Sequence, residues 1–152
     1  MGAVPLPPLV LGPQWTCTTT ARSRARTLLT VRRNDGAEVA VEVQRCSAGR
    51  LRHAYPAGAH DVEVRIAEAS PPELCTDVLR VLAGAIQAAD PRCRRVVFAA
   101  PVDDLEAVTA AEAAGYRYVV DVEVPGEDLS LLVAEPGWVT RVDMDLDRVP
   151  GT

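Results

Sequence analysis

The sequence contains no lysine, and all 16 of its basic residues are arginine. Chemistry that needs a lysine amine, such as a Schiff base, is therefore excluded. Aromatic residues make up only 4% of the chain, with a single phenylalanine, so a core must be built mainly from valine, leucine and alanine. No apolar run approaches the ~20 residues that a membrane-spanning helix needs. We expect alanine-rich helices packed on a valine-rich sheet, in a protein without a membrane partner.

The sequence also lacks a cysteine framework and a leader peptide. Its four cysteines are far apart and form no C-x-x-C pair: Cys17, Cys46, Cys75 and Cys93. This spacing favours free thiols in a reducing compartment over disulfides or a zinc site. The first residues have no basic region, and prolines interrupt their apolar run, so no signal peptide is predicted. We expect a cytoplasmic protein.

Charge is distributed unevenly along the chain. The net charge is -5, yet residues 1–60 carry eight arginines against three acids, and residues 61–152 carry eight against eighteen. Such polarity indicates either a basic ligand surface or two halves of one domain that attract each other. Arg22, Arg24 and Arg26 would form a basic stripe if they shared a strand, or would contact the acidic half. The negative net charge and the lack of interleaved aromatics oppose nucleic-acid binding.

The first 60 residues predict an arm, strands and a loop. Residues 1–14 hold four prolines, which is typical of an extended arm, either a proline-rich ligand or a poorly ordered terminus. Residues 25–33 and 37–45 are strand-like runs on either side of an Asn34-Asp35-Gly36 turn, which predicts a hairpin. Residues 15–20 can add a strand before it. Residues 47–59 lack periodicity and predict a long loop.

The next segments predict a strand and a long helix. Apolar and charged residues alternate over 60–67, as in a strand with one buried face. Over 70–90, apolar residues recur at intervals of three and four, as on one face of a helix. They are Leu74, Val78, Val81, Leu82, Ala85, Ile86 and Ala89. Ser70 as the cap, Pro71 in the first turn and Glu73 as a capping box predict where this helix begins.

The remainder predicts a strand, a short helix and a hairpin. The apolar run 96–100 suits a central strand, and Asp103 with Glu106 repeats the capping pattern before an alanine-rich helix that ends at Gly115. Alternation over 116–124, a turn and 129–135 predict a second hairpin, and 138–146 an added edge strand. The predicted fold is α/β, with a mixed central sheet of about six or seven strands and two main helices. One domain covers 15–147, followed by a tail at 148–152.

The order of these elements over residues 25–135 resembles that of the GNAT (N-acetyltransferase) superfamily. The most specific part is the stretch from Ala111 to Arg117, AEAAGYR, followed by the second hairpin. It is similar to the helix that ends in a Gly-aromatic pair in that family. The resemblance implies a shortened GNAT-like acyl-CoA N-acyltransferase fold, truncated at the N-terminus and divergent in the acyl-CoA loop.

The resemblance also implies where a cofactor would lie. Acyl-CoA would sit between the strand that ends near residues 66–68 and the strand 96–100, with its pyrophosphate at the start of the 70–90 helix. The cofactor-binding positions would be Ile66, Ala67, Glu68, Leu74, Cys75 and Thr76. Glu68, at the strand end, could act as general base toward an amine, or be a solvated structural carboxylate.

Three features depart from the family pattern. The family has Arg or Gln, two residues, Gly, any residue and then Gly or Ala at the pyrophosphate, where this chain has Pro71, Leu74 and Thr76. Prolines at 71 and 72 have no N–H, and Glu73 adds negative charge where a helix start would bind phosphate. The family's frequent general-acid tyrosine corresponds to Ala111. There is also little room before residue 25 for the family's first strand and the two helices that wall its acceptor pocket.

Two other groups of residues are candidates for sites. His53, Tyr55 and His60 could converge beside the sheet as proton carriers, but without a nucleophile motif they are more simply incidental. Asp143, Asp145 and Asp147 imitate the opening of a calcium loop, yet Arg148 replaces the required glycine and no glutamate closes the loop. A charged strand face is the better account, and no metal is predicted.

Two functional hypotheses follow. In the first, the chain is a GNAT-like protein that is degenerate for standard acetyl-CoA-dependent catalysis and acts through binding or assembly, with an unidentified protein partner or a second copy of itself. In the second, it is an active N-acyltransferase that holds acetyl-CoA or another acyl-CoA in a non-standard way. Only the second hypothesis requires a cofactor.

Overall fold

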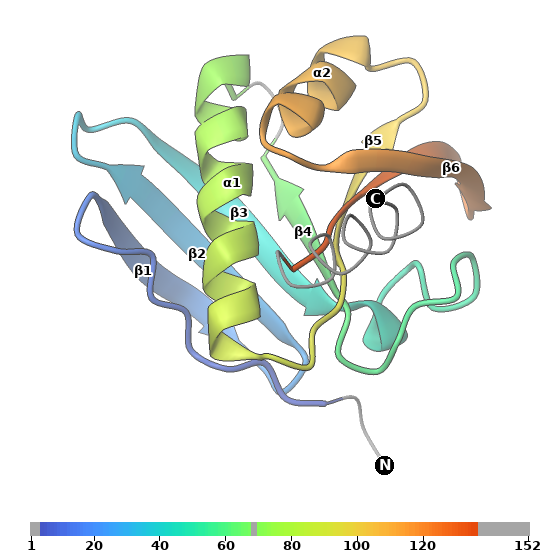
Figure 1. Ribbon diagram of the computed structural model, residues 1–152, viewed down its shortest axis with the longest axis horizontal. Coiled ribbons are helices and arrows are strands. Elements are labelled where there is room, and N and C mark those ends of the chain that lie inside the picture. Colours follow the sequence, from blue (N-terminus) through green and yellow to red (C-terminus); the bar gives the residue numbers. More distant parts are fainter. Residues whose placement is uncertain (1–3, 68–69, 137–152) are drawn as a thin grey trace, which may run out of the picture.

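The computed structural model describes residues 4–67 and 70–136, which form one seven-stranded mixed sheet and two helices (Figure 1). In chain order, the elements are β1 (Trp15–Arg22), β2 (Arg26–Arg33), β3 (Glu38–Arg45), a 3₁₀ turn (Cys46–Ala48), β4 (Val62–Ile66), α1 (Pro72–Ala89), β5 (Val96–Pro101), α2 (Leu105–Ala113), β6 (Arg117–Val124) and β7 (Glu127–Ala134). The predicted α/β fold is confirmed. The strand predicted at 138–146, the tail and the Asp143–Asp147 group lie outside the described residues.

The first four strands form an antiparallel run. β2 and β3 pair in register on either side of the predicted turn, where Gly36 has a φ of +93°, a backbone region that favours glycine. The Asp35 carboxylate accepts a hydrogen bond from the Ala37 N–H at 3.2 Å and so holds the turn. The predicted first hairpin is therefore confirmed, and β1 extends it by one strand.

β4 and β5 run parallel, with α1 as the crossover between them. Their pairing covers only Val62 with Val96, Glu63 with Val97 and Val64 with Phe98. β4 continues to Ile66 beside β3, and β5 continues to Pro101 beside β7. The sheet therefore splits beyond Val64 and Phe98, at the end where α1 begins.

The main core lies between the sheet and the two helices. Figure 1 shows α1 crossing one face of the sheet. The predicted helix face is confirmed, because Leu74, Val78, Leu82 and Ile86 are all at most 3% exposed. A second, smaller cluster fills the other face of the sheet: Cys46, Leu51, Val97, Ala99, Leu129, Leu131 and Val133. Tyr55 and Ala57 of the 47–59 loop pack against that cluster, so the loop is a cover for the sheet.

Both helices begin one residue later than predicted. The N-cap of α1 is Pro71, without a side-chain cap, and Ser70 Oγ instead donates a hydrogen bond to the Ala67 carbonyl at 2.8 Å. The N-cap of α2 is Asp104, whose carboxylate accepts from the Ala107 N–H at 3.1 Å. The predictions for Ser70 and Asp103 were therefore wrong. Two adjacent prolines fix an extended backbone before α1, which leaves no role for a cap at Ser70.

β6 contains a bulge that changes which side chains are buried. The register with β7 shifts between Tyr118 and Val120, and these two side chains are 46% and 38% exposed. Val119 instead packs against the second cluster. The alternation predicted through Tyr118 and Val120 was wrong because an extra residue in one strand reverses the facing of those beside it.

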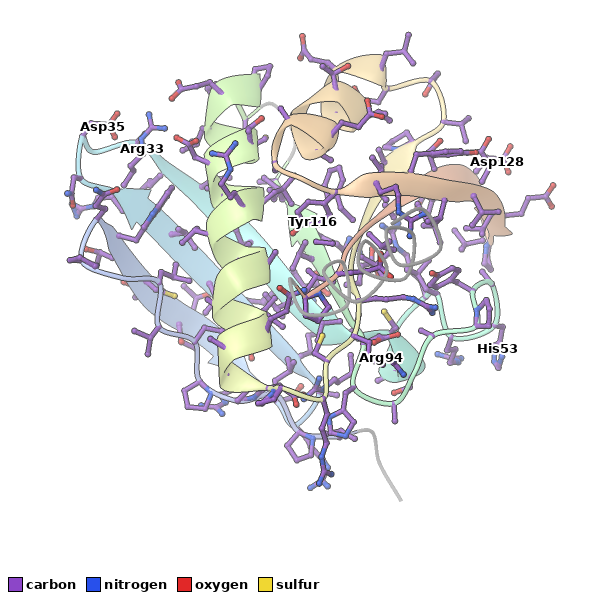
Figure 2. The ribbon with its side chains drawn as sticks, viewed as in Figure 1. Arg33, Asp35, His53, Arg94, Tyr116 and Asp128 are labelled. Carbon is purple, nitrogen blue, oxygen red and sulfur yellow. The ribbon has the colours of Figure 1, made fainter. Side chains whose placement is uncertain are left out.

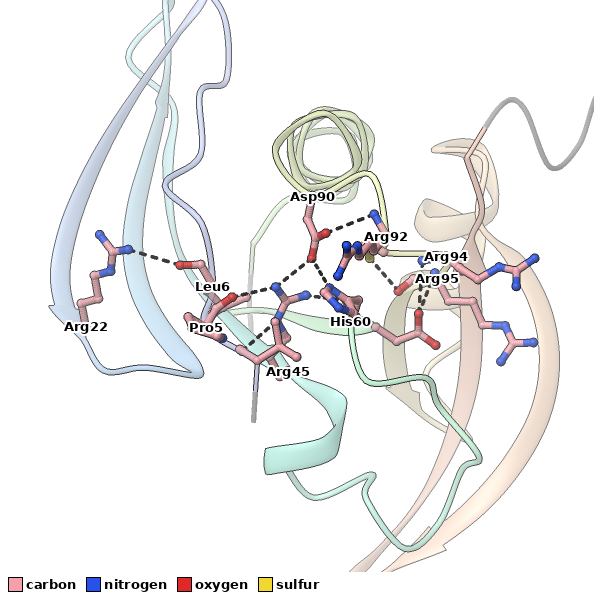
Figure 3. A network of polar contacts seen from close by, with 12 residues as sticks. Pro5, Leu6, Arg22, Arg45, His60, Asp90, Arg92, Arg94 and Arg95 are labelled. Atoms are coloured by element: carbon pink, nitrogen blue, oxygen red, sulfur yellow. Dashed lines mark hydrogen bonds and ion pairs between the residues drawn. The ribbon is translucent and has the colours of Figure 1, made fainter. Parts of the chain in front are cut away.

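The arm at residues 4–14 packs against the sheet through a buried arginine. Arg45, 1% exposed, forms an ion pair with Asp90 at 2.8 Å and donates hydrogen bonds to the Val4, Pro5 and His60 carbonyls (Figure 3). Leu6 follows with a 2.9 Å backbone hydrogen bond to Arg24, and its side chain is buried. The arm is thus part of the core, which its proline content did not predict.

Ion pairs join the basic first half of the chain to the acidic second half. Arg33 contacts Glu73 and Asp77, Arg45 contacts Asp90, and Arg50 contacts Glu63 and Glu127. These ion pairs therefore support the second interpretation of the charge asymmetry, that the two halves of the domain attract each other.

The predicted arginine stripe does not form on one strand. Arg22 ends β1, Arg24 lies in the turn and Arg26 begins β2. Arg22 donates to the Leu6 carbonyl at 3.2 Å, and Arg26 pairs with Glu42 at 2.8 Å. These arginines act within the fold, because the tight turn between β1 and β2 places them on different elements.

Leu82→Ala should lower the free energy of unfolding by about 2–5 kcal/mol, because it empties a fully buried leucine site. Leu105→Ala makes the same change at a residue that is 72% exposed, and should alter the free energy of unfolding by less than about 0.5 kcal/mol. Urea melts of both variants measure the difference. Similar losses at the two positions would contradict the core described above.

The Arg45–Asp90 pair generates a prediction about acid stability. Burial acts to raise the pKa of Asp90, but hydrogen bonds from His60, Arg45 and the Arg92 N–H outweigh it and hold the pKa below its ordinary value. Such a carboxylate stabilises the fold above its ordinary pKa, and the contribution is lost as pH falls through the lowered value. We expect wild-type stability to decline below about pH 4.

Arg45→Met should cost about 3–5 kcal/mol at pH 7, because it leaves Asp90 buried without its cation. The decline of stability below about pH 4 should also become shallower, since the pKa of Asp90 returns toward its ordinary value. Arg26→Met, which breaks the exposed pair with Glu42, is the control and should cost less than about 1 kcal/mol. Equal losses in urea melts from pH 2.5 to 7 would refute this role of Arg45.

Candidate functional site

A cavity of about 370 Å³ opens where β4 and β5 stop pairing. Its walls come from the ends of β4 and β5, the start of α1, and α2, and they include Ile66, Ala67, Pro72, Cys75, Ala100 and Ala110. We call this cavity the cleft. Its volume falls in the range of ordinary small-molecule sites, and a split parallel pair brings strand ends and a helix start to one place.

The start of α1 at the cleft has few hydrogen-bond donors. An α-helix normally begins with four N–H groups that have no partner within the helix. Here the N-cap is Pro71 and the next residue is Pro72, neither of which has an N–H, while the Cys75 N–H already bonds to the Pro71 carbonyl at 3.0 Å. Only Glu73 and Leu74 can offer a backbone N–H to a ligand.

A cluster of charges surrounds Glu73. Arg33 Nη1 lies 2.7 Å from a carboxylate oxygen of Glu73 and 2.7 Å from one of Asp77, and Arg33 Nη2 lies 2.8 Å from Asp35. The hydrogen bond from Arg33 lowers the pKa of Asp35 to about 2. Figure 2 shows Arg33 and Asp35 at the β2–β3 turn, at the end of the molecule where α1 begins. Arg33 is therefore shared among three carboxylates.

The structure separates the predicted cofactor-binding residues. Ile66, Ala67 and Cys75 line the cleft. The Leu74 side chain is buried in the core, with 3% of the residue exposed, so only the Leu74 backbone is available for binding. The Thr76 hydroxyl donates to the Ala110 carbonyl at 2.9 Å and joins α1 to α2. Glu68 lies outside the described residues, so its role as a general base stays a prediction.

Charged residues that the sequence did not assign to a site also line the cleft: Arg50, Arg65, Asp104, Glu106 and Glu127. Arg50 comes from the 47–59 loop and pairs with the buried Glu63 at 2.8 Å and with Glu127 at 3.0 Å. Arg65 is exposed and stands at the end of β4. The position of Arg65 on the wall of the cleft could have been predicted, because Arg65 alternates with the apolar Val64 and Ile66. Nothing in the sequence near Arg50 indicated its position.

Solved structures share the fold of this chain, although no protein-family model and no curated protein sequence matches it. The aminoglycoside acetyltransferase AAC(6')-Ib in complex with coenzyme A and kanamycin is similar at a TM-score of 0.63 and 17% identity, over 77% of this chain and 70% of that one. An uncharacterised protein from Bacillus halodurans is similar at 0.63 and 18%, over 75% and 61%. The chain has a GNAT N-acetyltransferase fold. At these identities the likeness shows the fold alone.

Ala111, the residue that the resemblance to the family sets at the place of its usual general acid, has no proton donor and is fully buried. The nearby Tyr116 is 3% exposed, and its hydroxyl donates to the Leu79 carbonyl at 2.8 Å, beneath α1. Burial raises the pKa of Tyr116. Its hydroxyl therefore fixes the Gly-aromatic turn to α1.

The connection between the first two strands is short. The resemblance implies two helices after the first strand, as a wall for an acceptor, whereas here β1 and β2 are joined by residues 23–25 alone. His53, Tyr55 and His60 do not gather at the cleft: His60 contacts Asp90, and the Tyr55 ring lies under Arg95. The residues described in 4–67 and 70–136 contain no group of side chains suited to a metal ion and no helix long and apolar enough to cross a membrane.

The cysteines give a direct test of this description. All four are free; Cys46 and Cys93 are buried, and Cys17 and Cys75 are partly buried. Burial raises the pKa of Cys93 to about 12 and also raises that of Cys75, where the carboxylates of Asp104 and Glu106 contribute. Fewer thiolates at neutral pH mean slower alkylation, so the rate at Cys75 should keep increasing above pH 9.

Intact-mass measurement after alkylation without reductant should show two modified thiols in the folded protein and four in urea. Peptide mapping should assign the two native modifications to Cys17 and Cys75. Fewer than four modified thiols in urea would indicate a disulfide, and rapid native modification of Cys93 would contradict its burial.

Proposed function

We propose that this GNAT-fold protein does not carry out standard acetyl-CoA-dependent acyl transfer, and that it acts through binding or assembly at the cleft. The observation that carries the proposal is the start of α1. A helix start binds a diphosphate through its free N–H groups and the positive end of its dipole. Here two of the four positions are prolines, and the first turn carries Glu73.

The local charge supports the same conclusion. Glu73 is 74% exposed at its side chain, so it adds an anion at the place where a diphosphate would approach. Its cation partner Arg33 is already divided among Asp35, Glu73 and Asp77. A diphosphate would have to displace one of these carboxylates from Arg33, which removes most of the gain from a new ion pair.

The acid and the acceptor wall of a standard enzyme are reduced as well. General acid catalysis needs a titratable group within hydrogen-bond reach of the leaving group. Ala111 offers none, and the Tyr116 hydroxyl is engaged beneath α1. The three-residue turn between β1 and β2 also leaves the acceptor side without the helices that close it in the family.

The cleft itself favours a binding role. It combines apolar surface from Ile66, Phe98 and Ala100 with the charged side chains of Arg65 and Glu106. A site of this mixed character can hold a ligand or an extended segment of a protein, a second copy of this chain included, in the gap between two strands. A cytoplasmic location, expected from the sequence, is part of this proposal.

A second candidate function is active N-acyl transfer with the cofactor's phosphates held by arginine. The observation that favours it is the presence of Arg50 and Arg65 on the wall of the cleft. Arginine binds phosphate oxygens in pairs, so the two residues could replace a helix start. AAC(6')-Ib, which shares the fold, has been solved with acetyl-CoA and with coenzyme A, so an acyl-CoA is the cofactor to test.

Acetyl-CoA at millimolar concentration should leave the thermal unfolding of the wild-type protein unchanged. A ligand present at about 100 times its Kd would add roughly 2.7 kcal/mol, which a melting curve detects easily. The triple variant Pro71→Gly, Pro72→Gly, Glu73→Gln returns two N–H donors and removes one charge, so it should bind acetyl-CoA in calorimetry.

The control carries Pro7→Gly, Pro8→Gly and Glu38→Gln, which is the same change in composition away from the cleft, and it should not bind. Micromolar binding by the wild-type protein would overturn the proposal. If Arg65→Gln then abolished that binding, the acyltransferase with an arginine grip would become the function.

A further inference from the structure

A second cavity, of about 430 Å³, lies at the far end of α1, where the chain turns into β5. It is lined by three arginines, Arg92, Arg94 and Arg95, together with His60, Asp61 and Glu135. We call it the arginine cavity. α1 has 18 residues, so the cleft and the arginine cavity are separated by a helix of about 27 Å. The proposed function uses none of these residues.

Two buried carboxylates hold the backbone of the arginine turn. Asp61 is 2% exposed, and its Oδ1 accepts hydrogen bonds from the Arg94 and Arg95 N–H groups at 3.3 and 3.1 Å. Asp90 is 8% exposed, and its Oδ1 accepts from the Arg92 N–H at 3.1 Å. The three arginines are therefore presented by a turn that buried side chains organise (Figure 3).

The guanidinium of Arg95 is positioned by the loop that covers the sheet. It lies 5.8 Å from the centre of the Tyr55 ring and donates to the Pro56 carbonyl at 3.5 Å. A cation over an aromatic face is attracted to it, and a guanidinium has five N–H donors, so most of them stay available to a ligand. Arg92 is exposed, and its guanidinium makes no hydrogen bond or ion pair with residues 4–67 or 70–136.

The carboxylates at the arginine cavity form no ion pair with Arg92 or Arg95 within residues 4–67 and 70–136. The second oxygen of Asp61 accepts from the Gly58 N–H at 2.8 Å, so both of its oxygens are engaged by backbone donors. Glu135 pairs with Arg117 at 3.1 Å, a cation from β6. The guanidinium groups of Arg92 and Arg95 therefore bring positive charge to a concave space, whereas an exposed arginine on a flat surface is simply solvated.

We infer that the arginine cavity is a binding site for a small phosphate-bearing anion. Guanidinium groups match phosphate oxygens in paired hydrogen bonds, and such charge-assisted bonds are about twice as strong as neutral ones. The backbone that presents the arginines is already held, so little ordering is required on binding. The volume suits a small molecule. The inference does not depend on the proposed function, since it concerns the other end of α1.

Inorganic pyrophosphate is the probe, titrated into the full chain by calorimetry at constant ionic strength, because salt screens exposed charges. Arg92→Gln with Arg95→Gln should weaken binding about 10-fold or more. The control, Arg26→Gln with Arg32→Gln on β2, removes the same charge from an exposed strand and should change the affinity less than about 2-fold. Amide shifts in a ¹⁵N spectrum of the wild-type protein should centre on residues 92–95.

The single variant Arg92→Gln leaves the Arg95–Tyr55 contact intact and should still weaken pyrophosphate binding. It therefore distinguishes an effect on ligand recognition from an effect on the packing of the loop. The inference fails if the wild-type protein does not bind millimolar pyrophosphate, or if the two double variants lose the same affinity. It also fails if the amide shifts centre on the cleft, around Arg65 and Cys75.

Discussion

The burial of one guanidinium organises this protein. Arg45 stands at the end of β3 with 1% of its surface exposed, and a charge taken out of water must have its donors satisfied. Its partners come from segments far apart in sequence: the arm at Val4 and Pro5, the loop at His60, and the end of α1 at Asp90. If this pair were broken, the arm, the loop and the α1–β5 turn would lose their common anchor. The start of β5, and so the arginine cavity, depends on where that turn lies.

The two ends of α1 have opposite chemistry. At its start, prolines remove N–H donors and Glu73 adds a carboxylate, so this helix start has fewer donors for an anion than an ordinary one. Beyond its end, Asp61 and Asp90 accept hydrogen bonds from the backbone N–H groups of the turn, Asp90 also pairs with Arg45, and neither forms an ion pair with Arg92 or Arg95. The cleft and the arginine cavity therefore lie at opposite ends of α1 and have different sets of charged side chains on their walls.

The split between β4 and β5 is a consequence of topology. A parallel pair needs a crossover, and α1 leaves β4 at the point where the pairing stops. Beyond Phe98, β5 continues alongside β7, and Arg65 and Ile66 stay with β3. The cleft follows from this geometry whatever its side chains are, which explains how the fold can be shared at 17% identity with an enzyme that acts on aminoglycosides.

Local patterns in the sequence determined most of the elements. The hairpin at Asn34-Asp35-Gly36, the buried face of α1 and the missing donors at Pro71 and Pro72 could all be predicted, because turn chemistry, helical periodicity and the absence of an N–H act within a few residues. The order of elements over 25–135 also indicated the fold family. Predictions for individual residues were wrong where a nearby feature changed the local backbone. The prolines moved the cap of α1 from Ser70 to Pro71, and a bulge in β6 turned Tyr118 outward.

Only the tertiary structure decided what the charged residues do. Nothing near Arg45, Arg50 or Arg95 in the sequence distinguishes them from solvated arginines, since their partners lie 13 to 77 residues away. Even the arm, whose prolines favour an extended and poorly ordered segment, is held because Arg45 reaches its carbonyls. The sequence determines the charge of a side chain. Its partners depend on which segments the fold brings together, and such long-range contacts produce no periodic pattern in the sequence.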